Sequence, residues 1–86
     1  MRYLSSKKFD KQFSKLPKGL KLKAVERVTI FTKDPFAPIL NNHQLNGVWA
    51  NCRSINITAD IRAVYEMVEE DLAYFVAIGS HAELYR

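Results

Sequence analysis

The order of hydrophobic and polar residues predicts a strand and then a helix at the start of the chain. The first six residues, MRYLSS, alternate well enough for a short strand. Phe9, Phe13 and Leu16 then follow at steps of four and three residues, so they share one face of a helix over residues 7–16. Either of the two serines that precede this helix can cap it.

A second helix is predicted over residues 20–33, after the segment LPKG interrupts the periodicity with Pro17 and Gly19. Its apolar positions also lie along one face: Leu20, Ala24, Val28 and Phe31. Asp34 precedes a proline, which disfavours helical backbone in the residue before it, so we expect the helix to end there. The two helices are therefore expected to form a hairpin laid over a sheet.

The second half of the chain has the pattern of a loop followed by strands. The segment PFAPILNNHQLNG, residues 35–47, contains two prolines, three asparagines and a glycine and is predicted to be a loop. Three strand candidates follow, VWANCRSINIT, IRAVYEMV and LAYFVAI, with the acidic turn EEDL between the last two. In the first of them, alternation places Arg53, Ile55 and Ile57 on one side and Cys52, Ser54 and Asn56 on the other.

The predicted fold class is α+β, in the order β-α-α-β-β-β. An N-terminal strand is followed by a helical hairpin and by a three-strand antiparallel meander packed on the helices. A chain of 86 residues is expected to form a single domain, 1–86. The last strand is predicted to end at Gly79 and its neighbour to begin at Arg62. Antiparallel pairing would then place Arg62, His81 and Tyr85 at one rim of the sheet.

Charge is unevenly distributed along the chain. Residues 1–33 carry ten Lys/Arg and two acids, a net +8, whereas residues 34–86 carry three Arg and seven acids, a net −4. A basic region of this density can bind the phosphates of a nucleic acid, although lysines on amphipathic helices can also serve only solubility. The candidate RNA-binding lysines are Lys7, Lys8, Lys11, Lys15, Lys18, Lys21 and Lys23.

Several classes of protein are disfavoured by what the sequence lacks. No apolar run approaches the ~20 residues of a membrane span, and the N-terminus has no signal-peptide pattern. The single cysteine, Cys52, cannot form a disulfide within the chain, so we expect a cytoplasmic protein without a membrane partner. The motifs GxGxxG, GxxxxGK[ST], CxxC and HExxH are absent, so no cofactor and no metal are expected.

The residues that could carry chemistry are few. His43 and His81 can serve as acid and base, because an unperturbed imidazole titrates near pH ~6.5. Arg53 and Arg62 can hold a phosphate and offset the charge of a pentavalent transition state. RNA cleavage needs little more, since the ribose 2′-hydroxyl supplies the nucleophile. Many small proteins own two histidines, however, so these residue types alone do not establish the reaction.

Three segments, DPFAPILNNHQLNG, RSINITADIRAVY and IGSHAELY, resemble in this order the RelE/YafQ superfamily of bacterial toxins, and the resemblance spans the whole chain. These toxins are the killer halves of type II toxin–antitoxin pairs. The resemblance implies an endoribonuclease that enters the ribosomal A site and cuts mRNA there. It also implies a small cognate antitoxin encoded beside the toxin.

The resemblance also implies functions for individual residues. His43 matches a histidine of YafQ-like toxins, although Gln44 replaces the proline that follows it in the family. Asp60 matches a YafQ aspartate implicated in activity. Asn56 stands where YafQ has a second histidine, so one proposed acid–base group of that family is missing here.

The remaining matches lie in the last two strands and the tail. Arg62 matches an arginine that RelE and YoeB use on the scissile phosphate. His81 matches the histidine of the YafQ ending, and Tyr85 matches a terminal aromatic residue that is expected to stack on an mRNA base. The chain thus resembles a YafQ relative with a RelE-type arginine, and which histidine is acid and which is base stays open.

Structural interpretations of these residues stay open as well. Asp60 and His43 can be turn residues, Arg53 can pair with a surface acid, and Tyr85 can pack in the core. Two other functions remain: a ParE-like toxin that binds DNA gyrase, or a basic RNA-binding module without catalysis. ParE-type chains generally lack the His/Arg set, which argues against the first.

Overall fold

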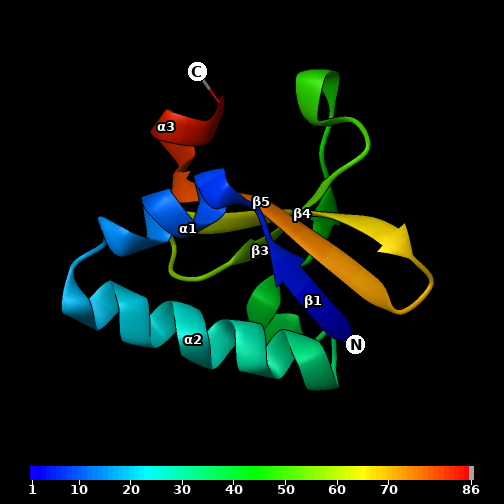
Figure 1. Ribbon diagram of the computed structural model, residues 1–86, viewed down its shortest axis with the longest axis horizontal. Coiled ribbons are helices and arrows are strands. Elements are labelled where there is room, and N and C mark those ends of the chain that lie inside the picture. Colours follow the sequence, from blue (N-terminus) through cyan, green and yellow to red (C-terminus); the bar gives the residue numbers. More distant parts are fainter. Residues whose placement is uncertain (86) are drawn as a thin grey trace.

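The computed structural model describes residues 1–85, which form one sheet with helices on both of its faces (Figure 1). The strands are β1 (Arg2–Ser5), β2 (His43–Gln44), β3 (Arg53–Asn56), β4 (Ile61–Glu69) and β5 (Leu72–Ser80). The helices are α1 (Lys7–Ser14), α2 (Lys18–Lys33) and α3 (His81–Tyr85), with 3₁₀ turns η1 (Pro38–Leu40) and η2 (Gly47–Trp49). The predicted α+β class, the N-terminal strand, the helical hairpin and the antiparallel run of β3, β4 and β5 are confirmed.

The sheet of the described residues has five strands in the order β1-β5-β4-β3-β2, and this differs from the predicted meander at both edges. At one edge, β1 pairs in parallel with β5, with Arg2 opposite Leu72 and Ser5 opposite Phe75. The sheet is therefore mixed. Partners that lie about seventy residues apart leave no local sequence pattern that would predict their direction.

At the other edge, a two-residue strand lies inside the segment 35–47 that is predicted to be a loop. His43 pairs with Ser54, and Gln44 pairs with Arg53. The pairing strand β3 is also shorter than predicted, because the residues before it form η2 and a turn. The sequence does not predict β2, because asparagines on both sides of it give the segment the composition of a loop.

An extra residue, Val76, forms a bulge in β5. Val64 lies opposite Ala77, but the next residue, Tyr65, lies opposite Phe75. A bulge turns the residues beyond it to the other face of the sheet. Phe75 consequently packs in the cluster beneath α2, whereas Ala77 belongs to the cluster on the opposite face.

Beyond the end of β1, helix α1 lies against the strand β5. Ser6 caps α1, because its Oγ accepts a hydrogen bond from the Phe9 N–H at 2.9 Å. The same hydroxyl donates to the carbonyl of Val76 at 3.1 Å. Gln12 then accepts from the N–H of Ile78 at 3.0 Å. The side chains of Ser6 and Gln12 thus satisfy backbone groups of β5 that the four-residue β1 does not reach.

The main core lies between α2 and the sheet, where aromatic rings meet. Phe31 of α2 lies 4.8 Å from Tyr65 and 5.3 Å from Phe75, measured between ring centroids, and all three are buried. The buried residues of α2 are Ala24, Val28 and Phe31, as the predicted apolar face requires. None of the helices formed by residues 1–85 is long and apolar enough to cross a bilayer.

A smaller cluster occupies the opposite face of the sheet, beneath α3. Its buried members are Cys52, Val64, Ala77 and Leu84. Alternate residues of the strands therefore serve different faces: Ile55, Ala63 and Ile78 face the main core, and Ser54, Val64 and Ala77 face α3. In Figure 1, α2 and α3 accordingly lie on opposite sides of the strands.

The two hydrogen bonds of Ser6 generate a stability prediction. Ser6→Ala removes the helix cap and the bond to Val76, so the free energy of unfolding is expected to fall by about 0.5–2 kcal/mol. Urea unfolding measures the change. Ser14→Ala is the matched control, because its hydroxyl donates only to Lys11 on an exposed surface; it is expected to change stability by less than about 0.5 kcal/mol. Equal losses in the two variants would contradict the role given to Ser6.

Candidate active site

Helix α3 begins with a capping box. The Oγ of Ser80 accepts from the N–H of Glu83 at 3.1 Å, and Oε1 of Glu83 accepts from the N–H of Ser80 at 2.8 Å. The Ser-x-x-Glu spacing is the sequence signature of this cap. The predicted fold assigns no helix to the tail, so this signal was missed. The cap turns the chain back over the end of β5.

Two further hydrogen bonds hold α3 against the sheet. The N–H of His81 donates to the carbonyl of Asp60 at 3.0 Å, across the start of β4. At the other end, Leu84 is buried and its carbonyl accepts from the indole Nε1 of Trp49 at 3.2 Å. Residues 81–85 are held in place because both ends of this five-residue helix are bonded to other elements.

His81 and Tyr85 are four residues apart on α3 and therefore share a face of the helix. Their ring centroids lie 4.8 Å apart at an interplanar angle of 63°, an edge-to-face contact. His81 is exposed, whereas Tyr85 is half-buried against the smaller cluster, and its hydroxyl lies 3.3 Å from Oγ of Ser54. The pair combines an accessible imidazole with an aromatic ring whose position is constrained.

Arg62 lies at the same rim, as predicted. It is opposite Gly79 of β5 and Asn56 of β3. One guanidinium nitrogen, Nη2, donates to the carbonyl of Ala59 at 2.7 Å. Nε of Arg62 and Oδ1 of Asn56 are buried without a hydrogen-bond partner among the described residues. An arginine whose charge has no carboxylate partner in residues 1–85 is suited to hold a phosphate.

His43 lies on the same face of the sheet, because it pairs with Ser54 on the neighbouring strand. Its Nδ1 is 2.9 Å from the carbonyl of Asn41, which has left-handed backbone with φ 45°. A carbonyl can only accept, so Nδ1 carries the proton and Nε2 of the neutral ring is a proton acceptor. The structure thus brings His43 to the face that carries Tyr85 and Arg62.

Asp60 is exposed in the turn between β3 and β4. Its N–H donates to Oγ1 of Thr58 at 3.3 Å, and its carbonyl accepts from the N–H of His81. The carboxylate itself forms no hydrogen bond or ion pair with the residues that the structure describes. Asp60 therefore adjoins His81 through the backbone, and its place in a turn agrees with the structural interpretation of this residue.

Arg53 is the predicted site residue that the structure does not bring to this group. Its Nε donates to Oδ1 of Asn42 at 2.7 Å, and its guanidinium lies 5.2 Å from the centroid of the Phe36 ring. Asn42 in turn donates to the hydroxyl of Tyr65 at 2.8 Å. Arg53 thus faces the main core, on the opposite side of the sheet from His81.

The predicted RNA-binding lysines lie on the two long helices. Those on α1 are Lys7, Lys8, Lys11 and Lys15 of its C-cap, and those on α2 are Lys18, Lys21 and Lys23. Lys8 is next to the site, since its Nζ lies 5.9 Å from the centroid of the Trp49 ring. Within residues 1–85, Lys23 alone of these seven forms an ion pair, at 3.4 Å with Glu26.

Cys52 is buried in the smaller cluster. Burial raises the pKa of its thiol, and the nearby carboxylate of Glu66 raises it further. A raised pKa keeps the thiol protonated at neutral pH, and only the thiolate is an effective nucleophile or metal ligand. Cys52 therefore serves as a small packing residue. Across the described part of the chain, no three His, Cys, Asp or Glu side chains gather as they would around a metal ion.

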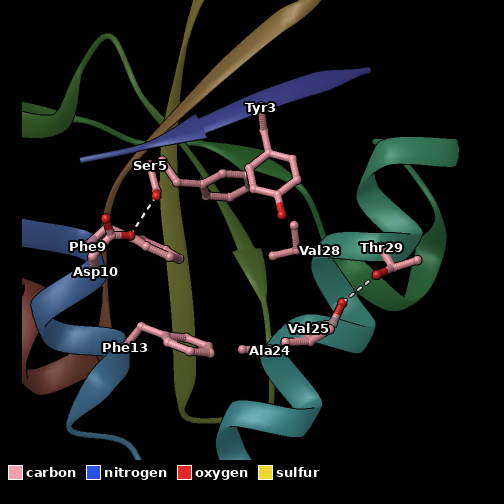
Figure 2. A pocket seen from close by; sticks show the side chains of 10 residues that line it. Tyr3, Ser5, Phe9, Asp10, Phe13, Ala24, Val25, Val28 and Thr29 are labelled. Atoms are coloured by element: carbon pink, nitrogen blue, oxygen red, sulfur yellow. Dashed lines mark hydrogen bonds between the residues drawn. The ribbon is translucent and has the colours of Figure 1, made fainter. Parts of the chain in front are cut away.

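An apolar groove of about 210 Å³ opens between β1, α1 and α2. Figure 2 shows Tyr3, Phe13 and Val25 along it, with Asp10 at one end bonded to Ser5 at 2.6 Å. None of the predicted catalytic residues lines this groove. The predicted catalytic residues other than Arg53 lie instead around α3, on the opposite face of the sheet or in the turn at its rim.

A family model described as a bacterial toxin of a type II toxin–antitoxin system, YafQ, matches residues 1–86. The search of curated proteins gave no match.

Solved structures of toxins share the fold. A YafQ mutant from E. coli, H87Q, is 22% identical over 100% of both chains, with a TM-score of 0.76. YafQ in the E. coli DinJ–YafQ complex is 23% identical over 100% of both chains, with a TM-score of 0.73. A metal-bound toxin from Helicobacter pylori is 30% identical over 99% of both chains, with a TM-score of 0.69.

The bond between Trp49 and Leu84 generates a prediction about local order. Trp49→Phe keeps an aromatic ring but removes the indole N–H, so the end of α3 loses its anchor to η2. Amide hydrogen exchange in α3 is expected to become roughly 2–10-fold faster. The amides of β4 in the same variant are the internal control and should keep their rates. Unchanged exchange in α3 would show that this bond does not hold the helix.

Proposed function

Because the chain belongs to the YafQ family of bacterial toxins of type II toxin–antitoxin systems, we propose that it is a metal-independent endoribonuclease that cuts mRNA on the ribosome. One observation carries the proposal. Arg62, whose guanidinium has no carboxylate partner among the described residues, lies opposite Gly79 at the rim where His81 begins α3. A phosphate binder on β4 and an acid–base group at the start of α3 thus lie at the same rim of the sheet.

The proposed reaction uses the RNA as its own nucleophile. A base removes the proton of a ribose 2′-hydroxyl, and the oxygen attacks the adjacent phosphorus. The bond to the 5′ oxygen breaks, and an acid protonates that oxygen, which leaves a cyclic phosphate and a 5′-hydroxyl end. We assign one proton transfer to His81 and the other to His43, whose Nε2 is available. Arg62 offsets the charge that accumulates on the phosphorus oxygens.

The other predicted residues are proposed to support this group. Tyr85 presents its ring to an mRNA base, since aromatic stacking is a common way to hold unpaired RNA. Asp60 fixes the start of α3 through its carbonyl bond to His81. Arg53 supports β2 from the opposite face of the sheet through its bond to Asn42.

The proposed partners are a cognate antitoxin, mRNA on the ribosome and ribosomal RNA, in the cytoplasm. The antitoxin is supported by the solved DinJ–YafQ toxin–antitoxin complex of E. coli, which contains a chain similar to this one. Ribosomal RNA is supported by the lysines of α1 and α2, which belong to a region with ten basic and two acidic residues.

The catalytic assignment predicts a separation of activity from stability. His81→Ala is expected to slow ribosome-dependent mRNA cleavage by roughly 10²–10⁴-fold, the usual contribution of one acid–base group. Arg62→Ala is expected to relieve toxicity as well. Neither should lower the Tm appreciably, because His81 is exposed and Arg62 lies at the rim. Arg2→Ala is the control arginine, because Arg2 is exposed and forms an ion pair with Asp71 at 3.8 Å, away from the proposed site.

The products of the reaction test the same proposal. Cleavage should survive a chelator and leave 5′-hydroxyl ends with a cyclic or 3′-phosphate. A metal requirement, or 5′-phosphate ends, would indicate another class of nuclease. Full toxicity of the double variant His81→Ala/Arg62→Ala would refute the assignment. Growth arrest without cut mRNA would favour the gyrase-binding alternative, which a supercoiling assay detects.

The lysines predict a salt-dependent association with the ribosome. Reversing four of them to Glu, at Lys7, Lys8, Lys11 and Lys15, should weaken ribosome binding. The slope of log affinity against log salt should fall by roughly 0.7–0.9 for each RNA phosphate that the variant no longer neutralises. Lys33→Glu, at the far end of α2, is the single-charge control. An unchanged affinity and slope would show that the lysines of α1 serve only solubility.

A further inference from the structure

Ser54 is the one polar side chain that is fully buried among residues 1–85, with an exposed fraction of 0%. It lies on β3, opposite His43 of β2 and Val64 of β4, on the face that α3 covers. The other buried residues of that face are apolar or, like Cys52, kept neutral. A hydroxyl in such surroundings needs a hydrogen-bond partner, and the identity of the partner shows what the hydroxyl does.

The partner is the hydroxyl of Tyr85, at 3.3 Å. The ring of Tyr85 meets the imidazole of His81 edge to face at 4.8 Å. Ring nitrogens of His81 form no hydrogen bond with the residues that the structure describes. The Tyr85 ring therefore contacts the imidazole on one side, and its hydroxyl end is hydrogen-bonded to Ser54.

We propose that Ser54 is a positioning residue for His81. Its buried hydroxyl holds the Tyr85 ring, and the ring holds the imidazole at the angle from which it exchanges a proton with RNA. The inference rests on the proposed function for its effect on cleavage, but not for its effect on the imidazole. Ser54 lies beneath α3 and does not itself meet the substrate.

Three variants isolate this hydrogen bond: Ser54→Ala, Tyr85→Phe and their double. Each single variant removes one hydroxyl and keeps the packing and the aromatic ring. Because both variants break the same bond, the test still stands if one of them fails to fold. Single-turnover mRNA cleavage is expected to slow roughly 2–10-fold in each, with KM unchanged. The double should be no slower than the slower single, because the bond is already absent. Ser14→Ala, on the exposed face of α1, is the control and should cleave at the wild-type rate.

NMR of the free protein tests the positioning without RNA. The ring current of Tyr85 displaces the imidazole proton signals of His81, and Tyr85→Ala defines their values without that ring. In Ser54→Ala and in Tyr85→Phe, we expect the signals to move toward those values. Moved signals in a protein that cuts no mRNA would uphold the positioning and refute the proposed function. Signals that stay at their wild-type positions in both variants would overturn the proposal, whatever happens to cleavage.

Discussion

One extra residue in β5 decides which side chains reach each face of the sheet. In a regular strand Phe75 and Ala77 would face the same way, because side chains alternate with a period of two. The bulge at Val76 sends Phe75 to the aromatic core and Ala77 to the face beneath α3. The carbonyl of Val76 is satisfied by Ser6, so the residue that caps α1 also holds the bulge in place. Both the core and the site depend on this local irregularity.

The two faces of the sheet are built from side chains of different size. The core face presents large rings such as Tyr65 and Phe75 to α2. The other face is lined near the rim by Ala77 and Gly79, which let α3 lie close to the strands. A Cβ at Gly79 would meet Oε1 of Glu83 at 3.2 Å. Small residues in the sheet therefore make room for the helix that carries the proposed site residues His81 and Tyr85.

The elements that the sequence predicts well are those with long periodic patterns. The helical spacing of Phe9 and Phe13 and the antiparallel hairpin that brings Arg62 to the end of β5 were predictable because both signals are local. The parallel pairing of β1, the two-residue β2 and the bulge at Val76 are settled by contacts between distant segments, which no local pattern contains. The alternation of side chains along β3 predicts opposite faces for Arg53 and Ser54. Had this alternation been used to choose the site residues, it would have placed Arg53 on the face away from α3.

The short length of α3 has a consequence for how activity can be lost. Five residues make a helix that is marginal by itself, and its order comes from the cap at Ser80, the indole of Trp49 and the burial of Leu84. Local opening of α3 does not require the aromatic core to unfold, since the core lies across the sheet. Substitutions that abolish function through α3 would therefore leave a well-folded protein. Under the proposed function, substitutions that inactivate the protein without unfolding it are expected to cluster around this helix.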